Sequence, residues 1–343
     1  MFVLVSDSYY KKGKWWTMKK LCLLILLLVT LVACGCKQTQ APAASLIDES
    51  TSQSYGVMDD AGRTLHFEQK PQRIVSLTYG TDEILTDLVD IKRIAAYSRW
   101  AGDSGISFIT KDQAYKVGRK LNENTEEILA MQPDLVVVSS ATSKAFVDQL
   151  DSLGVKVYVA RSPHNYKEMC AKIIGIAHAV GEPERGRMMV QKMDMQLKEL
   201  ETRLNRIPPS KRRVAVAFNF TSAMGRKGDL LDSMLNMAHV VNGAAVITEN
   251  SKAARHSSTP IISQEQIVLI NPDIFLLPTW NYNKQKDVRG YAYALMNDPA
   301  YKNVKAVQNG QLKFVSDKYR YVASQHIVDA VENIARAVYP EYF

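Results

Sequence analysis

Arginine and aromatic residues recur directly after the short apolar runs that are predicted to form strands. Ligands of open parallel sheets bind beyond the carboxyl ends of the strands, so these positions form a candidate binding site, although some of them could be ordinary surface residues. Guanidinium groups pair with carboxylates, catecholates or hydroxamates, and aromatic rings cover planar or macrocyclic ligands. The predicted ligand-binding residues are Tyr79, Arg99, Trp100, Arg161, His256, Trp280, Tyr282 and Tyr319. The same strand ends carry Thr78, Ser98, His164, Asn219, Phe220, Arg255 and Tyr321.

Direct metal binding and catalysis have weaker support in the sequence. The six histidines are scattered, without HxH or HExxH spacing, and His164 and His256 are the two that could reach a chelated iron or a haem from a loop. There is no G-x-S-x-G motif, no P-loop and no cysteine paired with a histidine as a nucleophile. We therefore expect a binding protein with no catalytic residues, no directly bound metal and no cofactor.

Acidic residues cluster on the first helical segment of each half of the chain. Glu83, Asp87 and Asp90 share the face opposite the apolar stripe of the first segment, and Asp229 and Asp232 are placed similarly in the second half. Such acids can belong to a solvated helix face, where they also favour the amino-terminal end of the helix dipole.

Within the first 33 residues, the segment from Met18 onwards resembles a secretory signal peptide. A basic start at Met18-Lys19-Lys20 precedes an almost continuous apolar run over 21–32, which is too short to span a bilayer. The run ends at Leu31-Val-Ala-Cys34, which resembles a bacterial lipobox and predicts lipidation of Cys34; a plain signal peptide with an incidental cysteine is the alternative. Residues 1–17 fit no part of a signal peptide, so Met18 is the expected true start.

The segment after the signal is predicted to be a lipidated tether over 34–60, because it is rich in Gln, Thr, Ala, Pro and Ser. The chain would then be anchored at the cell membrane on its extracytoplasmic side. Residues 1–33 carry five lysines and one acid, so the rest of the chain has a formal charge of +4 rather than +8. That mild, scattered charge argues against nucleic acid as a partner.

Short apolar runs alternate with helical patterns throughout the remaining sequence, from about Arg63 onwards. This alternation predicts an α/β fold with parallel sheets and helices on both faces. The expected strands cover 73–77, 93–97, 135–138 and 155–160 in the first half, and 213–218, 274–277 and 312–315 in the second half. Helices are expected from about Thr81, with Ile84, Leu85, Leu88 and Ile91 on one face, and over 230–238.

The two halves repeat one plan. Glu127-Ile-Leu-Ala-Met-Gln-Pro-Asp134 and Gln266-Ile-Val-Leu-Ile-Asn-Pro-Asp273 each predict a helix, a proline stop and a strand. Between the halves, apolar residues at spacings of three and four from Met189 to Ile207 predict one long helix; a coiled-coil seam is the alternative. We expect Rossmann-like lobes over 61–183 and 208–343, a connecting helix over 184–207 and a ligand cleft between the lobes.

Several motifs, in this order, resemble the iron-siderophore/cobalamin class of periplasmic-binding proteins of ABC transporters. The resemblance covers about Arg63 to Phe343, and no single motif is diagnostic. The motifs are Lys70-Pro-Gln-Arg-Ile-Val-Ser-Leu77, Glu83-Ile-Leu, Val117-Gly118, 122–134, Ser263-Gln-Glu-Gln-Ile267, Asn271-Pro-Asp273 and Ala306-Val-Gln-Asn-Gly310.

The resemblance implies two α/β lobes joined by a helix that resists hinge closure, and a monomeric receptor that delivers a ferric siderophore or similar iron chelate to an ABC importer. The implied partners are the permease dimer and its ATPase. Haem or a cobamide is the alternative cargo, and a sensor lipoprotein without transport is the alternative role. The resemblance also implies docking of the permease by an acid on each lobe, Glu83 and Asp232. The family often has a glutamate where Asp232-Ser233 stands, which weakens that second assignment.

Overall fold

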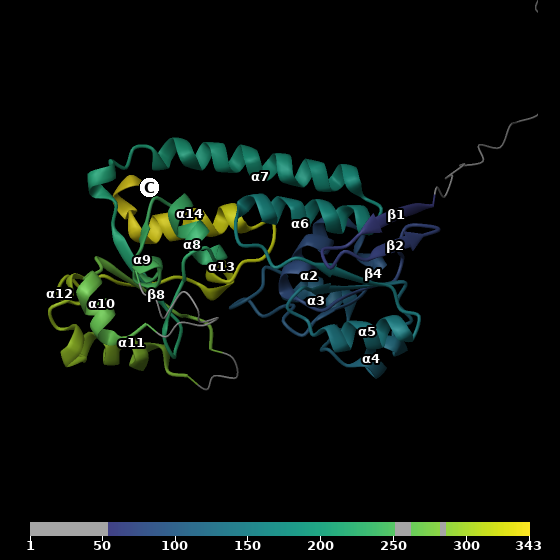
Figure 1. Ribbon diagram of the computed structural model, residues 1–343, viewed down its shortest axis with the longest axis horizontal. Helices are drawn as coiled ribbons and strands as arrows, with labels where there is room; N and C mark the ends of the chain where they lie inside the picture. Colours follow the sequence, from purple (N-terminus) through teal and green to yellow (C-terminus); the bar gives the residue numbers. More distant parts are fainter. Residues whose placement is uncertain (1–53, 251–261, 282–285) are drawn as a thin grey trace, which may run out of the picture. The chain divides into compact units, whose positions relative to one another are not determined.

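The computed structural model describes residues 54–250, 262–281 and 286–343, which belong to one compact unit. Cys34, His256 and Tyr282 lie outside the described residues. The described chain forms two α/β lobes, and Figure 1 shows the helix α7 (Pro183–Leu204) running along both of them. None of its helices combines the length and the apolar composition that crossing a membrane requires.

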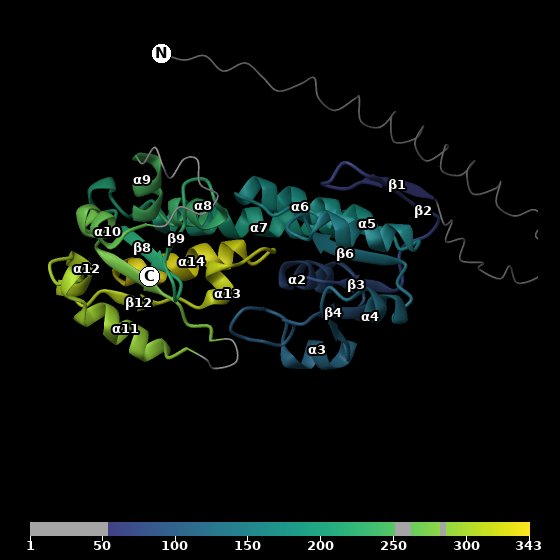
Figure 2. The ribbon, with the colours of Figure 1, turned by 60° about the horizontal axis from the view of Figure 1, so that its bottom comes forward.

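The first lobe contains a parallel sheet of five strands in the order β5-β4-β3-β6-β7. Alternate residues of these strands enter two different cores, because successive side chains point to opposite faces. Helices therefore cover both faces (Figure 2). The strands are β3 (Ile74–Ser76), β4 (Ile94–Ser98), β5 (Lys120–Leu121), β6 (Leu135–Ser139) and β7 (Val157–Ala160); the helices are α2 (Tyr79–Leu88), α3 (Lys111–Val117), α4 (Thr125–Ala130), α5 (Lys144–Ser152) and α6 (Tyr166–Ala179).

The second lobe repeats this arrangement with the strand order β10-β8-β11-β12, and a short strand β9 pairs antiparallel with β8. The strands are β8 (Val214–Phe218), β9 (Ala223–Met224), β10 (Val241–Asn242), β11 (Ile274–Leu277) and β12 (Leu312–Phe314). The helices are α8 (Leu230–Met237), α9 (Gly243–Asn250), α10 (Gln264–Ile270), α11 (Val288–Asn297), α12 (Lys305–Gln308), α13 (Asp317–Arg320) and α14 (Ile327–Val338). These elements confirm the predicted α/β fold with parallel sheets.

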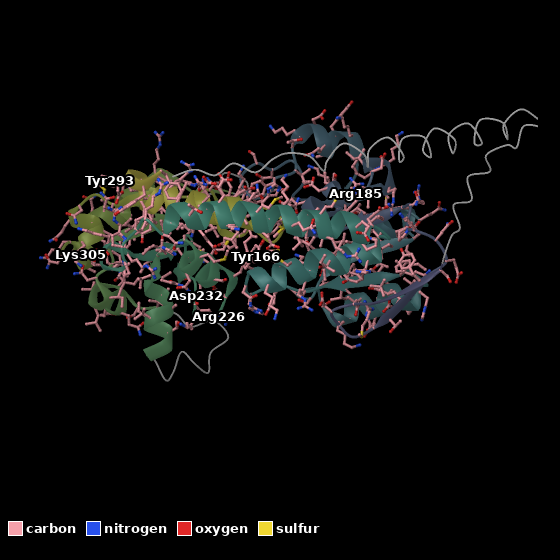
Figure 3. All side chains as sticks on the ribbon, turned by 90° about the horizontal axis from the view of Figure 1, so that it is seen from above. Tyr166, Arg185, Arg226, Asp232, Tyr293 and Lys305 are labelled. Atoms are coloured by element: carbon pink, nitrogen blue, oxygen red, sulfur yellow. The ribbon has the colours of Figure 1, made fainter. Side chains whose placement is uncertain are left out.

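Helix α7 contains 22 residues, so it is about 33 Å long at 1.5 Å per residue. It begins with Pro183, which suits the first turn of a helix because the missing N–H has no partner there. Met193, Leu200 and Leu204 on its inner face are buried in a core that also includes residues of both sheets. Figure 3 shows Tyr166 beside the middle of α7, where its hydroxyl donates to Asp194 Oδ1 at 2.8 Å.

The two repeated helix-to-strand corners, 127–134 and 266–273, have the same backbone conformation in both lobes. The residue before each proline adopts a left-handed conformation, with φ of 47° at Gln132 and 48° at Asn271. The aspartate after each proline then accepts a hydrogen bond from the backbone at the start of the first sheet strand. These bonds run from Arg73 N to Asp134 Oδ1 at 2.8 Å and from Val214 N to Asp273 Oδ2 at 2.8 Å.

Regular structure begins earlier than the sequence predicts. An antiparallel hairpin of β1 (Tyr55–Met58) and β2 (Thr64–Phe67) precedes the first sheet, so the end of the predicted tether is a strand. The Tyr55 and Phe67 rings stack at 5.1 Å, and Tyr55 Oη donates to Ala179 O at 3.2 Å. The prediction of a tether up to residue 60 is therefore wrong, because four-residue strands among polar residues leave little periodic signal.

Candidate ligand-binding site

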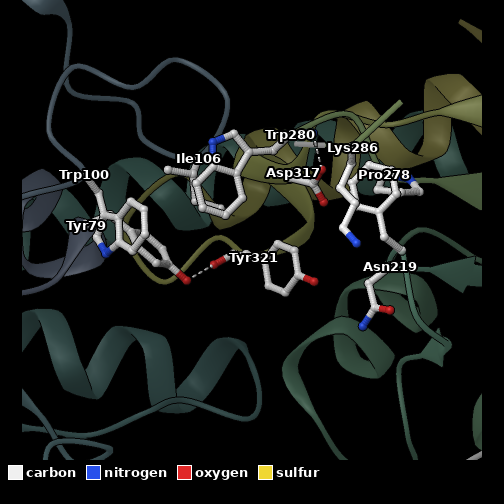
Figure 4. Close-up of a pocket in the computed structure, with 10 residues that line it drawn as sticks. Tyr79, Trp100, Ile106, Asn219, Pro278, Trp280, Lys286, Asp317 and Tyr321 are labelled. Atoms are coloured by element: carbon white, nitrogen blue, oxygen red, sulfur yellow. Dashed lines mark hydrogen bonds between the residues drawn. The ribbon is translucent and has the colours of Figure 1, made fainter. Parts of the chain in front are cut away.

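The carboxyl ends of strands from both lobes surround a cavity of about 440 Å³, which we call the aromatic compartment. Tyr79 follows β3 and Trp100 follows β4 in the first lobe, whereas Trp280 closely follows β11 in the second lobe. Figure 4 shows these side chains converging from the two lobes. The lining residues are Tyr79, Trp100, Ile106, Asn219, Phe220, Pro278, Trp280, Lys286, Asp317 and Tyr321.

Two tryptophans make an edge-to-face contact between the lobes. The Trp100 and Trp280 ring centroids lie 5.3 Å apart with an interplanar angle of 74°. The Arg99 guanidinium lies 4.0 Å from the Trp100 ring centroid, within the range of a cation–π contact. Trp280 Nε1 donates to Asp103 Oδ2 of the first lobe at 2.9 Å, which orients the indole. The compartment therefore has an aromatic wall formed by two tryptophans, with the Arg99 guanidinium beside it.

A buried ion pair shapes the floor of this compartment. Asp317 Oδ2 accepts from the backbone N–H groups of Thr279 at 2.7 Å and Trp280 at 2.6 Å, and so fixes the loop after β11. Asp317 Oδ1 pairs with Arg320 Nη1 at 3.1 Å, and Arg320 is only 2% exposed. Arg320 also donates to the carbonyl of Phe218 at the end of β8. These bonds connect the ends of two neighbouring strands.

A second cavity, of about 500 Å³, adjoins the first. Tyr79 and Tyr321 line both cavities, and Tyr79 Oη donates to Tyr321 O at 2.8 Å across the lobe boundary (Figure 4). Burial raises the pKa of the Tyr79 hydroxyl, which keeps it a donor. We call the second cavity the polar compartment because Thr78, Ser139, Thr142, Ser162, Lys172 and Asp229 are among its lining residues.

The predicted ligand residues fall into three groups. Tyr79, Trp100 and Trp280 line the aromatic compartment, and Arg99 stacks on Trp100. Arg161 and Tyr319 line neither cavity, whereas His256 and Tyr282 lie outside the described residues.

The two residues outside the cavities have structural contacts instead. Arg161 Nε donates to Asp60 Oδ1 at 2.7 Å, and the Tyr319 ring packs edge-to-face on Phe108 at 5.3 Å. Ligand contacts remain predictions for the whole predicted set.

Sequence reasoning missed several lining residues, among them Ile106, Lys286, Asp317 and Lys172. Ile106 and Lys286 lie in loops, where no periodic pattern marks them. Lys172 does have a signal, because it interrupts an apolar stripe of α6 that includes Met169, Ile173 and Ile176. A single lysine on a buried helix face is unusual and identifies a position where a charge meets the interior.

The prediction that Glu83 stands on an exposed helix face is wrong. Glu83 is 2% exposed, and burial raises the pKa of its carboxyl group. Its Oε1 accepts from Phe108 N at 2.9 Å, its Oε2 accepts from the Ser324 hydroxyl, and its carbonyl accepts from Gln325 Nε2 at 2.9 Å. Segments distant in the sequence cover this face of α2, which helical periodicity does not reveal.

Asp232 is also buried, at 4% exposure, so its predicted exposure is wrong as well. Asp232 Oδ1 accepts from Asn242 Nδ2 at 3.0 Å, and Oδ2 accepts from Gly228 N at 2.9 Å. A docking contact needs an accessible side chain, so we do not propose Glu83 or Asp232 for that role. The exposed acids near this face of the first lobe are Asp87 and Asp90.

Comparison with known proteins identifies the class to which this fold and cleft belong. The family model described as "Periplasmic binding protein" matches residues 74–319, so the chain belongs to that family. This confirms the resemblance found in the sequence, and the family is one of solute-binding proteins rather than enzymes.

Individual relatives are distant in sequence. In Bacillus subtilis, the probable siderophore-binding lipoprotein YfiY is 23% identical over 305 residues, which cover 86% of this chain and 90% of that protein. The Fe(3+)-citrate-binding protein YfmC of the same organism is 23% identical over 302 residues, covering 84% and 86%.

Solved structures share the fold. The periplasmic heme-binding protein RhuT from Roseiflexus, in its apo form, matches with a TM-score of 0.65 and 19% identity, over 79% of this chain and 99% of that one. Helicobacter pylori CeuE with Ni(II) bound matches with a TM-score of 0.64 and 17% identity, over 84% and 90%.

Proposed function

We propose that this protein captures a ferric siderophore or a similar iron chelate outside the cytoplasm and delivers it to an ABC importer. The observation that carries the proposal is the aromatic compartment, to which each lobe contributes a tryptophan. The organic shell of a chelate is broad and partly apolar, so aromatic walls bury it, and nearby Arg99 and Lys286 complement acidic groups. The descriptions of YfiY and YfmC point to the same class of cargo.

Haem is the second candidate cargo, and the aromatic lining of the same compartment favours it. A planar macrocycle fits between aromatic rings, and its carboxylates could pair with Arg99 or Lys286. RhuT, whose solved structure has a similar fold, is described as a heme-binding protein. The two candidates differ in what they bring to the site, because a siderophore surrounds its iron and haem leaves axial positions open to a side chain.

Tryptophan fluorescence tests the cargo directly. Ferric citrate, a neutral ferric trihydroxamate, haem and cobalamin are titrated into the purified chain and into Trp100→Phe, Trp280→Phe and Arg99→Ala variants. We expect a ferric chelate to bind the wild type with submicromolar affinity, and the Arg99→Ala variant to bind it about tenfold more weakly. The two Phe variants should show a reduced change in fluorescence. Tyr115→Phe is the control, because the Tyr115 ring is exposed and lines neither cavity. Tight binding of a bare divalent metal with no response to any chelate would contradict the proposal.

Transport is distinguished from sensing by uptake. Cells that lack this protein should lose import of the chelate identified by fluorescence, and the wild-type gene should restore it. Normal import in its absence would favour a sensor or another partner-binding role.

The membrane anchor is a further part of the proposal, because it rests on the lipobox-like Leu31-Val-Ala-Cys34. We expect Cys34→Ala to release the protein from membranes or to leave it unprocessed, because the thiol that receives the lipid is gone. Cys36→Ala should change neither property. An intact mass that corresponds to an unacylated mature chain in the wild type would contradict the anchor.

A further inference from the structure

The polar compartment has a wall of hydroxyl groups at the carboxyl ends of β6 and β7. Ser139 Oγ and Ser162 Oγ lie 3.0 Å apart, and Ser140 Oγ donates to Ser162 Oγ at 3.1 Å. Thr142 Oγ1 donates to Glu123 Oε1 at 2.9 Å at the edge of the same cavity. Hydroxyl groups both donate and accept, so this wall can match a ligand that carries hydroxyl and carboxyl oxygens.

Lys172 brings a basic side chain to the lining of this compartment. The residue is 3% exposed, and its Nζ donates to Ala323 O at 2.8 Å. Within the part of the chain that the structure describes, Nζ has this single hydrogen bond and no ion pair, although an ammonium has three donors. A buried charge is costly unless it is paired, so an anion bound beside this ammonium group would be favourable.

None of the described acidic groups around Lys172 forms an ion pair with its ammonium group. Glu83 and Asp60 act on it from beyond ion-pair distance, and the Glu83 carboxylate already accepts from Phe108 N and Ser324 Oγ. Asp229 lies in the same lining, but among the described residues it forms no ion pair with Lys172, and its Oδ1 accepts from Asp232 N at 2.8 Å. Burial lowers the pKa of Lys172 to about 8, so the side chain is still mostly protonated at neutral pH.

Two helices add to the positive potential of the cavity. The amino-terminal ends of α2 and α8, one from each lobe, contribute Thr78, Tyr79, Gly80, Asp229, Leu230 and Leu231 to the lining. Helix amino-terminal ends favour negative charge, and here they support the charge preference that the buried ammonium already sets.

We propose that the polar compartment is a second subsite of the cleft, that it takes an anionic, hydroxyl-bearing group of the hydroxycarboxylate class, and that Lys172 recognises the charge of that group. The inference rests on the proposed function, because the group would be an acidic arm of a chelate whose body occupies the aromatic compartment. The arm would reach past the Tyr79–Tyr321 hydrogen bond that lies between the two cavities.

The test compares chelates of different charge. Binding of ferric citrate, which is anionic and a hydroxycarboxylate, and of a neutral ferric trihydroxamate is measured by calorimetry for the wild type and for Lys172→Met. The control is Lys167→Met, an exposed lysine on the same helix. We expect Lys172→Met to weaken ferric citrate about 10- to 100-fold, as befits the loss of a charged hydrogen bond, and to change the neutral chelate by less than about threefold. The control should change neither.

Each other outcome counts against the inference. If Lys172→Met weakens both chelates equally, or weakens neither, Lys172 does not recognise the charge of the ligand. If the wild type binds the neutral chelate and no anionic one, the subsite is wrong while the proposed function stands. If the wild type binds no chelate at all, both fail. If the near-isosteric Lys172→Met fails to fold, as shown by loss of its melting transition, Lys172 is a structural link to Ala323 and the inference is overturned.

Discussion

Asp82 and Asp232 occupy matching places in the two lobes. Asp82 on α2 accepts from Ser98 N at 3.0 Å and from the Ser98 hydroxyl at 2.6 Å, at the end of β4. Asp232 on α8 accepts from Asn242 at the end of β10. In the first sheet β4 pairs with β3, and in the second sheet β10 pairs with β8 in the equivalent place. Each carboxylate therefore connects a helix to the end of the strand beside the first strand of its sheet.

The buried Asp82 makes the stability of the protein depend on pH. Burial raises the pKa of Asp82 to about 7, against the hydrogen bonds from Ser76 and Ser98, whereas the ordinary value is 3.8. Between these values the native carboxyl holds a proton that the unfolded chain releases, so stability falls as pH rises through this window. The free energy of unfolding of the wild type, relative to Asp82→Asn, should fall by roughly 2–4 kcal/mol from pH 4 to pH 7.

Urea unfolding of both proteins at several pH values measures this difference. Asp87→Asn, an exposed acid on the same helix, controls for the loss of one charge. Parallel stability profiles for wild type and Asp82→Asn would show that the carboxyl titrates normally.

Gly105 is the residue that leaves room for the Trp280 indole. A Cβ at this position would overlap Trp280 Cδ1, so Gly105→Ala should displace the ring and weaken its bond to Asp103. We expect stability to fall by about 1–3 kcal/mol through overpacking, and chelate affinity to fall with it. Tryptophan emission and calorimetric binding measure both effects.

Gly56→Ala is the matched control, because a Cβ there would make ordinary contacts with His66 at 3.5 Å. Wild-type affinity and emission in Gly105→Ala would mean that Trp280 does not depend on this close packing.

At the scale of elements, the helix-to-strand corners store backbone strain in one lobe more than in the other. Gln132 and Asn271 both have positive φ, but asparagine tolerates the left-handed region better than glutamine does. Gln132→Gly should therefore raise the free energy of unfolding by about 0.5–1 kcal/mol, whereas Asn271→Gly should leave it nearly unchanged. Chemical denaturation of the two variants makes the comparison, and a Gln132→Gly protein less stable than the wild type would contradict it.

At the scale of the whole molecule, helix α7 and one shared core connect the lobes. Residues of β3 and β8, from different sheets, enter the same core through α6, α7 and α14. The segment after α13 adds polar contacts to the first lobe, because Tyr321, Ala323 and Ser324 bond to Tyr79, Lys172 and Glu83. A continuous helix with packing on both lobes resists the backbone rotations that loop hinges absorb.

We therefore expect little closure when a chelate binds. Solution scattering curves of the wild type with and without ligand should nearly superpose, with the radius of gyration unchanged within error. Met195→Pro, which breaks α7 at an exposed position, should make the curves diverge and so shows that the method detects lobe motion. A large fall in the wild-type radius of gyration would indicate a loop hinge instead.

The sequence by itself determined the elements, their order and part of the site. Apolar runs between helical patterns predicted β3, β6, β8 and β11, because a buried parallel strand must be apolar on both faces. The rule that ligands bind at strand ends placed Tyr79, Trp100 and Trp280 at the cavity, since parallel strands bring their ends to one edge.

Only the tertiary structure decided which polar groups are buried. Glu83 looked exposed because helical periodicity describes one helix, whereas its cover comes from Phe108 and Ser324 in other segments. Arg161 follows a strand end, and its partner Asp60 comes from a turn about a hundred residues earlier. The sequence marks Lys172 as a charge within an apolar stripe, but the packing of α6 decides that it lines a cavity and bonds to Ala323. Pairing between distant segments sets the surroundings of a charge, and no local pattern in the sequence encodes it.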